Sequence, residues 1–231
     1  MDIDLHFTES GAGETLVLLH GNGESGEYFS KQKEYFSRGY RVVAVDTRGH
    51  GGSPRGSAPF TISQFANDLY EFFRRQGIEK AHLLGFSDGA NIALTFALRH
   101  QDMLRSLILN GANLDPAGIR PEVQLPIELG YKLTGAFADK SEEARHSAEL
   151  LRLMVMEPHI RPENLYALKV PTLVIVGSRD LIKLSHSRLI CGSIEDARLV
   201  MIKGDHFVAA KNPEDFNREV ERFLDELKTR G

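Results

Sequence analysis

Short runs of apolar residues recur along the chain, and each ends in a polar or glycine-rich segment. An unbroken apolar run is typical of a strand buried on both faces of a parallel sheet. Runs of this kind occupy residues 15–19, 40–46, 81–84, 106–110, 172–176 and 198–202. Residues 2–8 alternate polar and apolar side chains instead, which predicts a half-exposed strand at an edge of the sheet.

Helical patterns separate most of these runs. We expect helices over about 27–38, 61–76 and 88–100, another near 183–191, and a C-terminal amphipathic helix from Pro213. Strands that alternate with helices at this spacing indicate a parallel sheet covered on both faces. The sequence therefore predicts an α/β fold with a mostly parallel, doubly wound sheet.

The alternation stops between residues 113 and 166. This segment contains helical patterns, at 121–137 and 141–156, but no convincing strand. We interpret it as a small helical insertion. The core domain would then be formed by residues 1–112 and 167–231.

Composition narrows the possible partners and location. The chain has 231 residues, a net charge of −4 and one cysteine, Cys191, which cannot form an internal disulfide. With so small a charge, we expect neither nucleic acid nor an anionic membrane surface as a partner. No apolar run approaches the length of a membrane span, and the N-terminus lacks the features of a signal peptide. A cytoplasmic location is therefore expected, without membrane insertion.

The sequence Gly85-Phe86-Ser87-Asp88-Gly89 joins an apolar run to an alanine-rich helical pattern. It is a G-x-S-x-G elbow between a strand and a helix, the context that this motif requires. Ser87 would occupy a strained turn with its hydroxyl raised above the sheet. Gly85 and Gly89 would be required because a side chain at either position would meet the neighbouring strand or helix. The N-terminus of the following helix would favour negative charge that develops at the serine.

Two further polar residues follow apolar runs in the same way. Asp180 comes after the run at 172–176, and His206 comes after the run at 198–202, 26 residues later. Open α/β sheets bind ligands beyond the carboxyl ends of their strands, so Ser87, Asp180 and His206 are expected to meet there. No metal-ligand spacing is present. Gly21-Asn22-Gly23 also lacks the third glycine of a dinucleotide fingerprint, so we expect neither metal nor cofactor.

With these motifs, the chain resembles the α/β-hydrolase fold family over nearly its whole length. The order Ser, Asp, His is that of the family's triad. The matching segments are His20-Gly21-Asn22-Gly23, Asp46-Thr47-Arg48-Gly49-His50-Gly51-Gly52-Ser53, Gly85-Phe86-Ser87-Asp88-Gly89, Gly177-Ser178-Arg179-Asp180 and Gly204-Asp205-His206-Phe207. The members that it most resembles are small, capped, esterase-like hydrolases.

The resemblance implies a role for each site residue. Ser87 would attack an acyl carbonyl, His206 would transfer its proton, and Asp180 would orient the imidazole. The backbone N–H groups of Asn22 and Asp88 would form the oxyanion hole. The insertion would be a cap whose Phe137, Leu153 and Met154 line a pocket for a small to medium-sized substrate. A serine hydrolase that cleaves a carboxylic ester or thioester through an acyl-enzyme is the activity that these roles imply.

Several alternatives stay open at this point. Asp115, which follows the run at 106–110, is the competing triad acid, because some members of the fold place the acid there. If the Asp88 side chain faces the pocket, it would favour cationic substrates such as amino-acid esters; otherwise it is an ordinary acid in the first turn of a helix. The same triad also serves C–C bond hydrolases and amidases, and a binding or signalling protein could keep the fold with little turnover.

Overall fold

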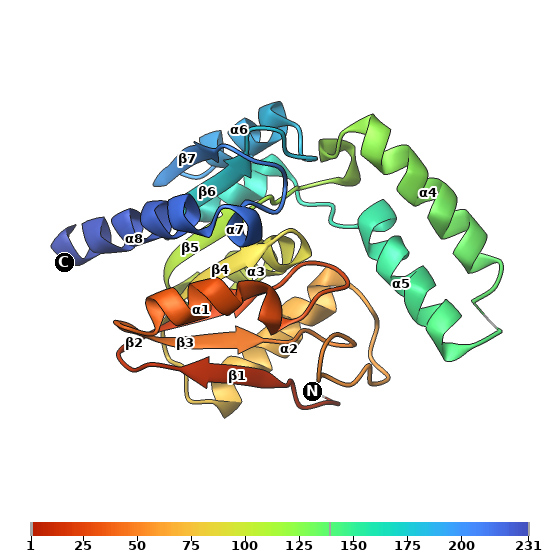
Figure 1. Ribbon diagram of the computed structural model, residues 1–231, viewed down its shortest axis with the longest axis horizontal. Helices are drawn as coiled ribbons and strands as arrows, with labels where there is room; N and C mark the ends of the chain where they lie inside the picture. Colours follow the sequence, from red (N-terminus) through yellow and green to blue (C-terminus); the bar gives the residue numbers. More distant parts are fainter. Residues whose placement is uncertain (1, 139, 231) are drawn as a thin grey trace.

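The computed structural model of the protein describes residues 2–138 and 140–230 (Figure 1). Within these residues a seven-stranded sheet has the order β1-β3-β2-β4-β5-β6-β7. Its strands are β1 (Phe7–Ser10), β2 (Glu14–Leu19), β3 (Tyr40–Val45), β4 (Ala81–Phe86), β5 (Leu104–Asn110), β6 (Thr172–Gly177) and β7 (Ala197–Ile202). Only β1 is antiparallel to its neighbour, so the predicted mostly parallel sheet is confirmed.

Helices cover both faces of this sheet (Figure 1). They are α1 (Ser30–Phe36), α2 (Ile62–Arg75), α3 (Asp88–His100), α6 (Leu184–Gly192), α7 (Val208–Lys211) and α8 (Pro213–Arg230). Short 3-10 helices occupy η1 (Gly26–Phe29) and η2 (Gln101–Met103). None of the helices in the described ranges is long and apolar enough to cross a membrane.

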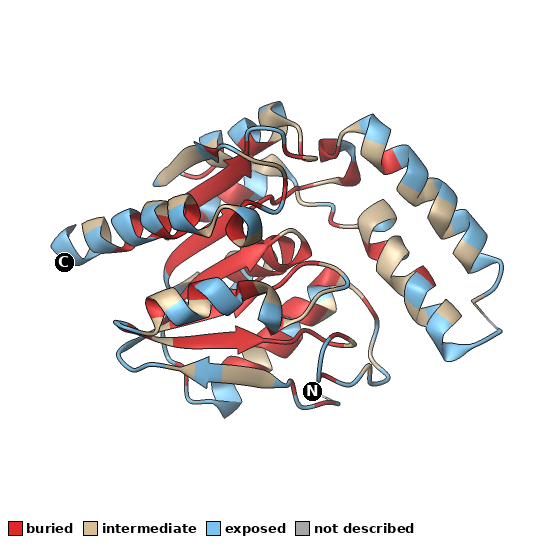
Figure 2. Cartoon of the chain, in the orientation of Figure 1, coloured by how far each residue is buried: buried red, intermediate tan, exposed pale blue. Residues whose placement is uncertain are grey.

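Successive side chains of each strand pack in two separate hydrophobic cores, one on each face of the sheet. In β2, Val17 and Leu19 pack with α2 and α3, whereas Leu16 and Leu18 pack with α1 and α8. This follows from the two-residue period of a strand, whose side chains point alternately to the two faces. Because both faces are covered, the parallel strands carry unbroken apolar runs. The inner strands β3 to β6 are buried along most of their length, whereas most of the edge strand β7 is only partly buried (Figure 2).

The predicted N-terminal edge strand begins later than the alternating pattern suggested. β1 starts at Phe7 and pairs with β3, so residues 2–6 lie outside the ladder. Ile3 and Leu5 are nevertheless buried in the core beside α2. The alternation therefore reports the burial of these two side chains rather than strand pairing.

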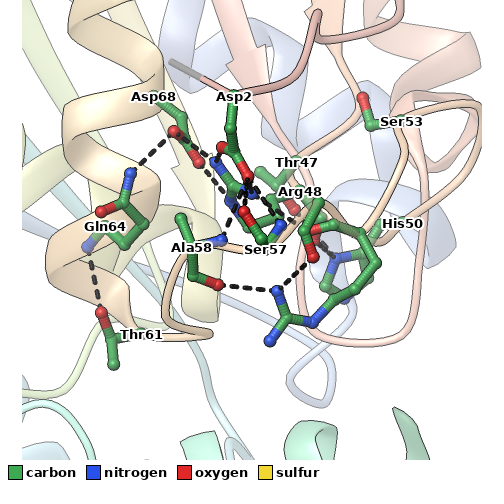
Figure 3. Close-up of polar contacts among 12 residues, drawn as sticks. Asp2, Thr47, Arg48, His50, Ser53, Ser57, Ala58, Thr61, Gln64 and Asp68 are labelled. Atoms are coloured by element: carbon green, nitrogen blue, oxygen red, sulfur yellow. Dashed lines mark hydrogen bonds and ion pairs between the residues drawn. The ribbon is translucent and has the colours of Figure 1, made fainter.

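The loop that follows β3 is fixed by a buried arginine (Figure 3). Arg48 is fully buried, and its guanidinium donates to Asp68 on α2 (Nε–Oδ2 2.7 Å, Nη2–Oδ1 2.8 Å). It also donates to Asp2 (Nη2–Oδ1 2.6 Å), which ties down the N-terminal segment. A cation that is removed from water requires such partners. The network thus fixes the loop after β3, which also carries Arg55.

Two helices of the segment 113–166 project from one side of the sheet as a hairpin (Figure 1). They are α4 (Pro121–Gly135) and α5 (Glu142–Met156); the 3-10 helices η3 (Pro116–Gly118) and η4 (Pro162–Ala167) flank them. Helix α5 lies nearer the core and α4 lies outside it. Arg55 forms a two-point ion pair with Glu149 of α5 (2.8 and 2.6 Å), and this links the hairpin to the loop after β3.

Candidate active site

Ser87 occupies the sharp turn between β4 and α3. Its backbone angles are φ 53° and ψ −120°, and among the described residues it is the one non-glycine residue with a positive φ. Such a conformation costs on the order of 1–3 kcal/mol and persists only where the surroundings impose it. Here Ser87 N donates to Asn110 O of β5 (2.8 Å), while Ser87 O accepts from the N–H groups of Ala90 and Asn91. The turn therefore holds the serine at the N-terminus of a buried helix.

The two glycines of the elbow allow close backbone contact. A Cβ atom at Gly85 would lie 2.2 Å from the carbonyl oxygen of Gly89. One at Gly89 would lie 2.1 Å from the carbonyl oxygen of Leu19 and 2.4 Å from that of His20. All three oxygens belong to the backbone and cannot rotate away, so α3 can approach β2 and β4 this closely only when glycine is present.

Gly89→Ala is therefore expected to lower the free energy of unfolding by about 3 kcal/mol or more, through steric overlap with β2. Urea denaturation followed by circular dichroism measures this loss. Gly192→Ala in α6 is the matched control, because its new Cβ would have no heavy atom within 4 Å. It should be neutral or stabilise by up to about 1 kcal/mol. Equal effects of the two substitutions would contradict this account of the elbow.

Asp180 and His206 form a buried pair at the carboxyl ends of β6 and β7. His206 Nδ1 lies 2.7 Å from Asp180 Oδ1, and the two residues are 4% and 2% exposed. The carboxylate also accepts from the backbone N–H groups of Gly177 (2.9 Å) and Ile182 (3.0 Å). Burial alone would raise the pKa of Asp180, but these bonds, above all that from His206, hold it below its usual value. Asp180 is therefore an anion that fixes His206 with Nδ1 as the donor.

The other ring nitrogen of His206 is directed away from the carboxylate. Nε2 is buried and has no hydrogen-bond partner among the described residues. The ring packs against Phe86, the residue before Ser87, with ring centroids 4.8 Å apart. On another side, a Cβ atom at Gly111 would lie 2.5 Å from Cε1 of His206. The imidazole thus has one orientation, with a free basic nitrogen beside the elbow.

The competing acid, Asp115, lies elsewhere. Its Oδ1 accepts from Ala117 N, which caps η3, and its Oδ2 pairs with His159 Nδ1 at 2.6 Å on the surface. Asp205, next to His206 in sequence, is exposed and pairs with Lys211. The structure brings Asp180, rather than either of these residues, to His206.

The side chains of Asn22 and Asp88 meet beside the elbow. Asn22 Nδ2 donates to Asp88 Oδ2 at 3.0 Å, and Asn91 Nδ2 donates to Asp88 Oδ1 at 3.3 Å. Asn91 in turn exchanges two hydrogen bonds with Asn113, at 3.0 and 2.9 Å. The carboxylate of Asp88 is thus committed to two amide groups, and the residue is 8% exposed. The N–H of Asp88 itself lies in the first turn of α3, where a helix offers no acceptor.

Burial raises the pKa of Asp88 to about 6, although the bonds from Asn22 and Asn91 act in the opposite direction. In the native protein the residue therefore binds a proton more readily than in the unfolded chain. Its contribution to stability is present below pH 3.8, the usual pKa of an aspartic acid, and is lost as the pH rises through about 6.

Asp88→Asn should remove this pH dependence. The free energy of unfolding of the wild type, relative to that of the variant, is expected to fall by up to about 3 kcal/mol between pH 4 and pH 7. Urea denaturation of both proteins at unit steps of pH measures the difference. A difference that stays constant across this range would contradict the raised pKa.

The predicted pocket residues lie in different surroundings. Leu153 on α5 is 1% exposed and packs in the core with α3, whereas Phe137 is half exposed, with Lys140 Nζ 4.3 Å from its ring centre. Met154 is partly buried. None of them lines the cavity of about 380 Å³ that touches Asp180 and His206. That cavity has mixed charge and is bordered by Arg120 and Glu122 at the start of α4.

Sequence reasoning missed the residues that support the site. Gly111 directly follows β5, and a glycine at the same sheet edge as the triad is a signal that could have found it. Asn91 follows Asp88 by one helical turn, which places the two side chains on one face. The pairing of Asn91 with Asn113 has no such sequence signal, because it depends on the packing of α3 against β5. In the described ranges, no group of three His, Cys, Asp or Glu residues is arranged to hold a metal ion.

Comparison with known proteins agrees with this architecture. Residues 14–147 match the family described as the alpha/beta hydrolase fold. The chain belongs to that family, and it is a hydrolase of that fold.

Three similar proteins illustrate the range of the family. A putative carbamate hydrolase, RutD, of Caulobacter sp. (strain K31) is 28% identical, over 96% of this chain and 94% of its own. A 2-hydroxy-6-oxononadienedioate/2-hydroxy-6-oxononatrienedioate hydrolase of Paraburkholderia phymatum is 31% identical, over 71% of this chain and 58% of its own. The crystal structure of a hydrolase from Pseudomonas aeruginosa PA01 superimposes with a TM-score of 0.79 at 25% identity and covers 96% of this chain and 94% of that one.

Proposed function

We propose that the protein is a serine hydrolase that cleaves a carboxylic ester or thioester through an acyl-enzyme. The observation that carries this proposal is the buried Asp180–His206 pair at 2.7 Å, with its free Nε2 beside the strained Ser87 turn. A histidine held in this tautomer is a general base for a serine hydroxyl.

The reaction proceeds in two halves. Ser87 Oγ attacks the acyl carbon while His206 Nε2 accepts its proton, and the carbonyl oxygen becomes an oxyanion. Backbone N–H groups of Asn22 and Asp88 stabilise that charge. The bond to the alcohol or thiol then breaks, and His206 returns the proton to the leaving group. Water, deprotonated by His206, next attacks the acyl-enzyme and releases the acid and the free serine.

The α4–α5 hairpin is proposed as the cap over this site. It belongs to the segment 113–166, and the Arg55–Glu149 ion pair holds its inner helix on the core. Its small size favours substrates of small to medium length. Met154 stays a candidate for contact with the acyl group, whereas Leu153 would reach a ligand only if α5 moved, since it is buried in the core.

Carbamate cleavage is the second candidate. It is favoured by the similarity to proteins named putative carbamate hydrolases over 96% or more of this chain. A carbamate presents the same kind of acyl carbon to Ser87, so the triad and oxyanion hole would serve both reactions. C–C bond cleavage has less support from the comparisons. The similar 2-hydroxy-6-oxononadienedioate hydrolase matches 71% of this chain, compared with 96% or more for the carbamate hydrolases.

Stopped-flow assays with p-nitrophenyl esters, an acyl thioester and an aryl carbamate test these alternatives. We expect a burst of one p-nitrophenol per active site followed by slower turnover, and a higher kcat/KM for short esters than for the carbamate. A carbamate that is the better substrate would favour the second candidate. Folded protein that hydrolyses none of these compounds would contradict the proposal and favour a binding role.

A further inference from the structure

The side chain of Asn22 connects three parts of the protein. Its Nδ2 donates to Asp88 Oδ2 at the start of α3 (3.0 Å) and to the backbone carbonyl oxygen of Leu150 on α5 (2.8 Å). Asn22 itself lies in the loop after β2. One amide group therefore bridges the loop, the elbow helix and the projecting hairpin.

Both hydrogens of the Asn22 amide are used in these two bonds. Asp88 accepts a hydrogen bond from Asn22 on Oδ2 and one from Asn91 on Oδ1, and Asn91 is fully buried. Asp88 is thus a fixed acceptor rather than a mobile surface carboxylate. The direction of every bond in the set is determined, because each amide N–H faces an oxygen.

The backbone on the two sides of Asn22 is restrained to different degrees. Gly21 precedes Asn22 and Gly23 follows it; Gly23 has φ +73° and no heavy atom within 4 Å of the position of a Cβ. The peptide group before Asn22 is held by its own bonds, since Gly21 O lies 2.7 Å from His20 Nδ1 and accepts from Glu24 N (3.3 Å). The backbone freedom of the loop therefore lies on the Gly23 side of Asn22. An oxyanion donor must lie within about 2.7–3.1 Å of the developing charge, so small rotations of this loop matter.

We propose that Asn22 is a positioning residue: the hydrogen bonds of its side chain orient its own backbone N–H toward the reacting carbonyl. Because one of these bonds is made to α5, the orientation of this N–H depends on the docking of α5. The inference rests on the proposed function. The Asn22 side chain does not donate a hydrogen bond to substrate, because both its donors are committed. It acts through the loop that it holds, and displacement of α5 would release one of its two restraints.

The chain offers a matched control for the docking of α5. Arg55 pairs with Glu149, the residue next to Leu150, but has no bond to Asn22 or Asp88. Arg55→Gln therefore weakens the attachment of α5 without touching the loop after β2. If Asn22 only held the hairpin, Asn22→Ala and Arg55→Gln would have similar effects on catalysis.

Single substitutions at Asn22 test the direction of the bonds. Asn22→Ala removes both bonds and keeps the backbone N–H; we expect kcat to fall about 10- to 100-fold, with KM changed less than about threefold. Asn22→Asp has nearly the same shape but turns acceptors toward Asp88 Oδ2 and Leu150 O. Above pH 7 it should be more impaired than Asn22→Ala, by about tenfold in kcat.

A double substitution separates the two bonds. Asn22→Asp with Asp88→Asn restores a donor–acceptor pair between positions 22 and 88 and still offers Asn91 an acceptor, but it does not restore the side-chain bond to Leu150 O. We expect its kcat to recover at least tenfold over Asn22→Asp. The swap keeps the volume of both side chains, so it also serves if Asn22→Ala fails to fold.

The measurements are kcat and KM on a p-nitrophenyl ester, per active site titrated with a fluorophosphonate, together with the melting temperature of each variant. A large loss of kcat in Asn22→Ala, a smaller one in Arg55→Gln and recovery in the swap support the inference. Unchanged kcat in Asn22→Ala, equal losses in Asn22→Ala and Arg55→Gln, or no recovery in the swap would overturn it. Wild-type protein that is not labelled at Ser87 would overturn the proposed function, and this inference with it.

Discussion

Ser87→Ala is expected to lower kcat by a factor on the order of 10⁴ or more, because no other hydroxyl occupies the elbow and the acyl-enzyme cannot form. The residual rate would come from substrate binding and from the oxyanion hole alone. Steady-state hydrolysis of a p-nitrophenyl ester, with the initial burst recorded, measures both the loss of turnover and the loss of the covalent step.

The stability of the same variants provides the control. Alanine keeps a Cβ atom at φ 53°, so Ser87→Ala should melt within a few degrees of the wild type. Ser87→Gly should be more stable than Ser87→Ala by about 1 kcal/mol, because glycine adopts this conformation without strain. A Ser87→Gly variant that is inactive and more stable than Ser87→Ala would show that the protein keeps the strained backbone at this position for its reaction. An active Ser87→Ala would contradict the assignment of the nucleophile.

Asp180→Asn is the second substitution with a large expected effect. The carboxylate accepts three N–H groups, from His206, Gly177 and Ile182. An amide has one oxygen and one NH₂ group, so in either orientation the NH₂ faces a donor. If it faces His206, the imidazole takes the wrong tautomer, and kcat should fall by a factor on the order of 10⁴. Either orientation leaves a buried donor unpaired, which should also cost about 1–3 kcal/mol of stability.

Asp115→Asn is the matched control for this loss. Asp115 pairs with His159 on the surface and has no bond to His206, so its substitution should leave kcat within about twofold of the wild type. Ester hydrolysis and urea denaturation of both variants distinguish the two acids. A greater loss of activity in Asp115→Asn than in Asp180→Asn would contradict the triad proposed here.

The fold could be predicted from sequence because its main signals are local. The unbroken apolar runs became β2 to β7, and the alanine-rich pattern after the elbow became α3, buried where it faces the sheet. The glycines of the elbow were interpretable for the same reason, since their positions relative to Ser87 are fixed by the turn. The N-terminal strand was placed too early, because buried side chains outside a ladder produce the same alternation as a strand.

The site was predictable only as far as the strand ends define it. Ser87, Asp180 and His206 each follow a strand of the same parallel sheet, and so they could be expected to lie at one edge. The bonds from Asn22 to Leu150 and from Asn91 to Asn113 join segments whose separation in space is set by helix packing. Nothing in the spacing of these residues indicates such contacts. The burial of Leu153 was likewise not readable, because an apolar residue on a helix can face a ligand or the core.

The most direct test of the central claim is intact-mass spectrometry after treatment with a fluorophosphonate, applied to the wild type and to Ser87→Ala. One phosphonyl adduct on the wild type, located on Ser87 by peptide mapping, and none on the variant is the predicted result, because only an activated serine displaces the fluoride at an appreciable rate. Folded wild-type protein without an adduct, or an adduct that persists in Ser87→Ala, would contradict the claim that Ser87 is the nucleophile of this hydrolase.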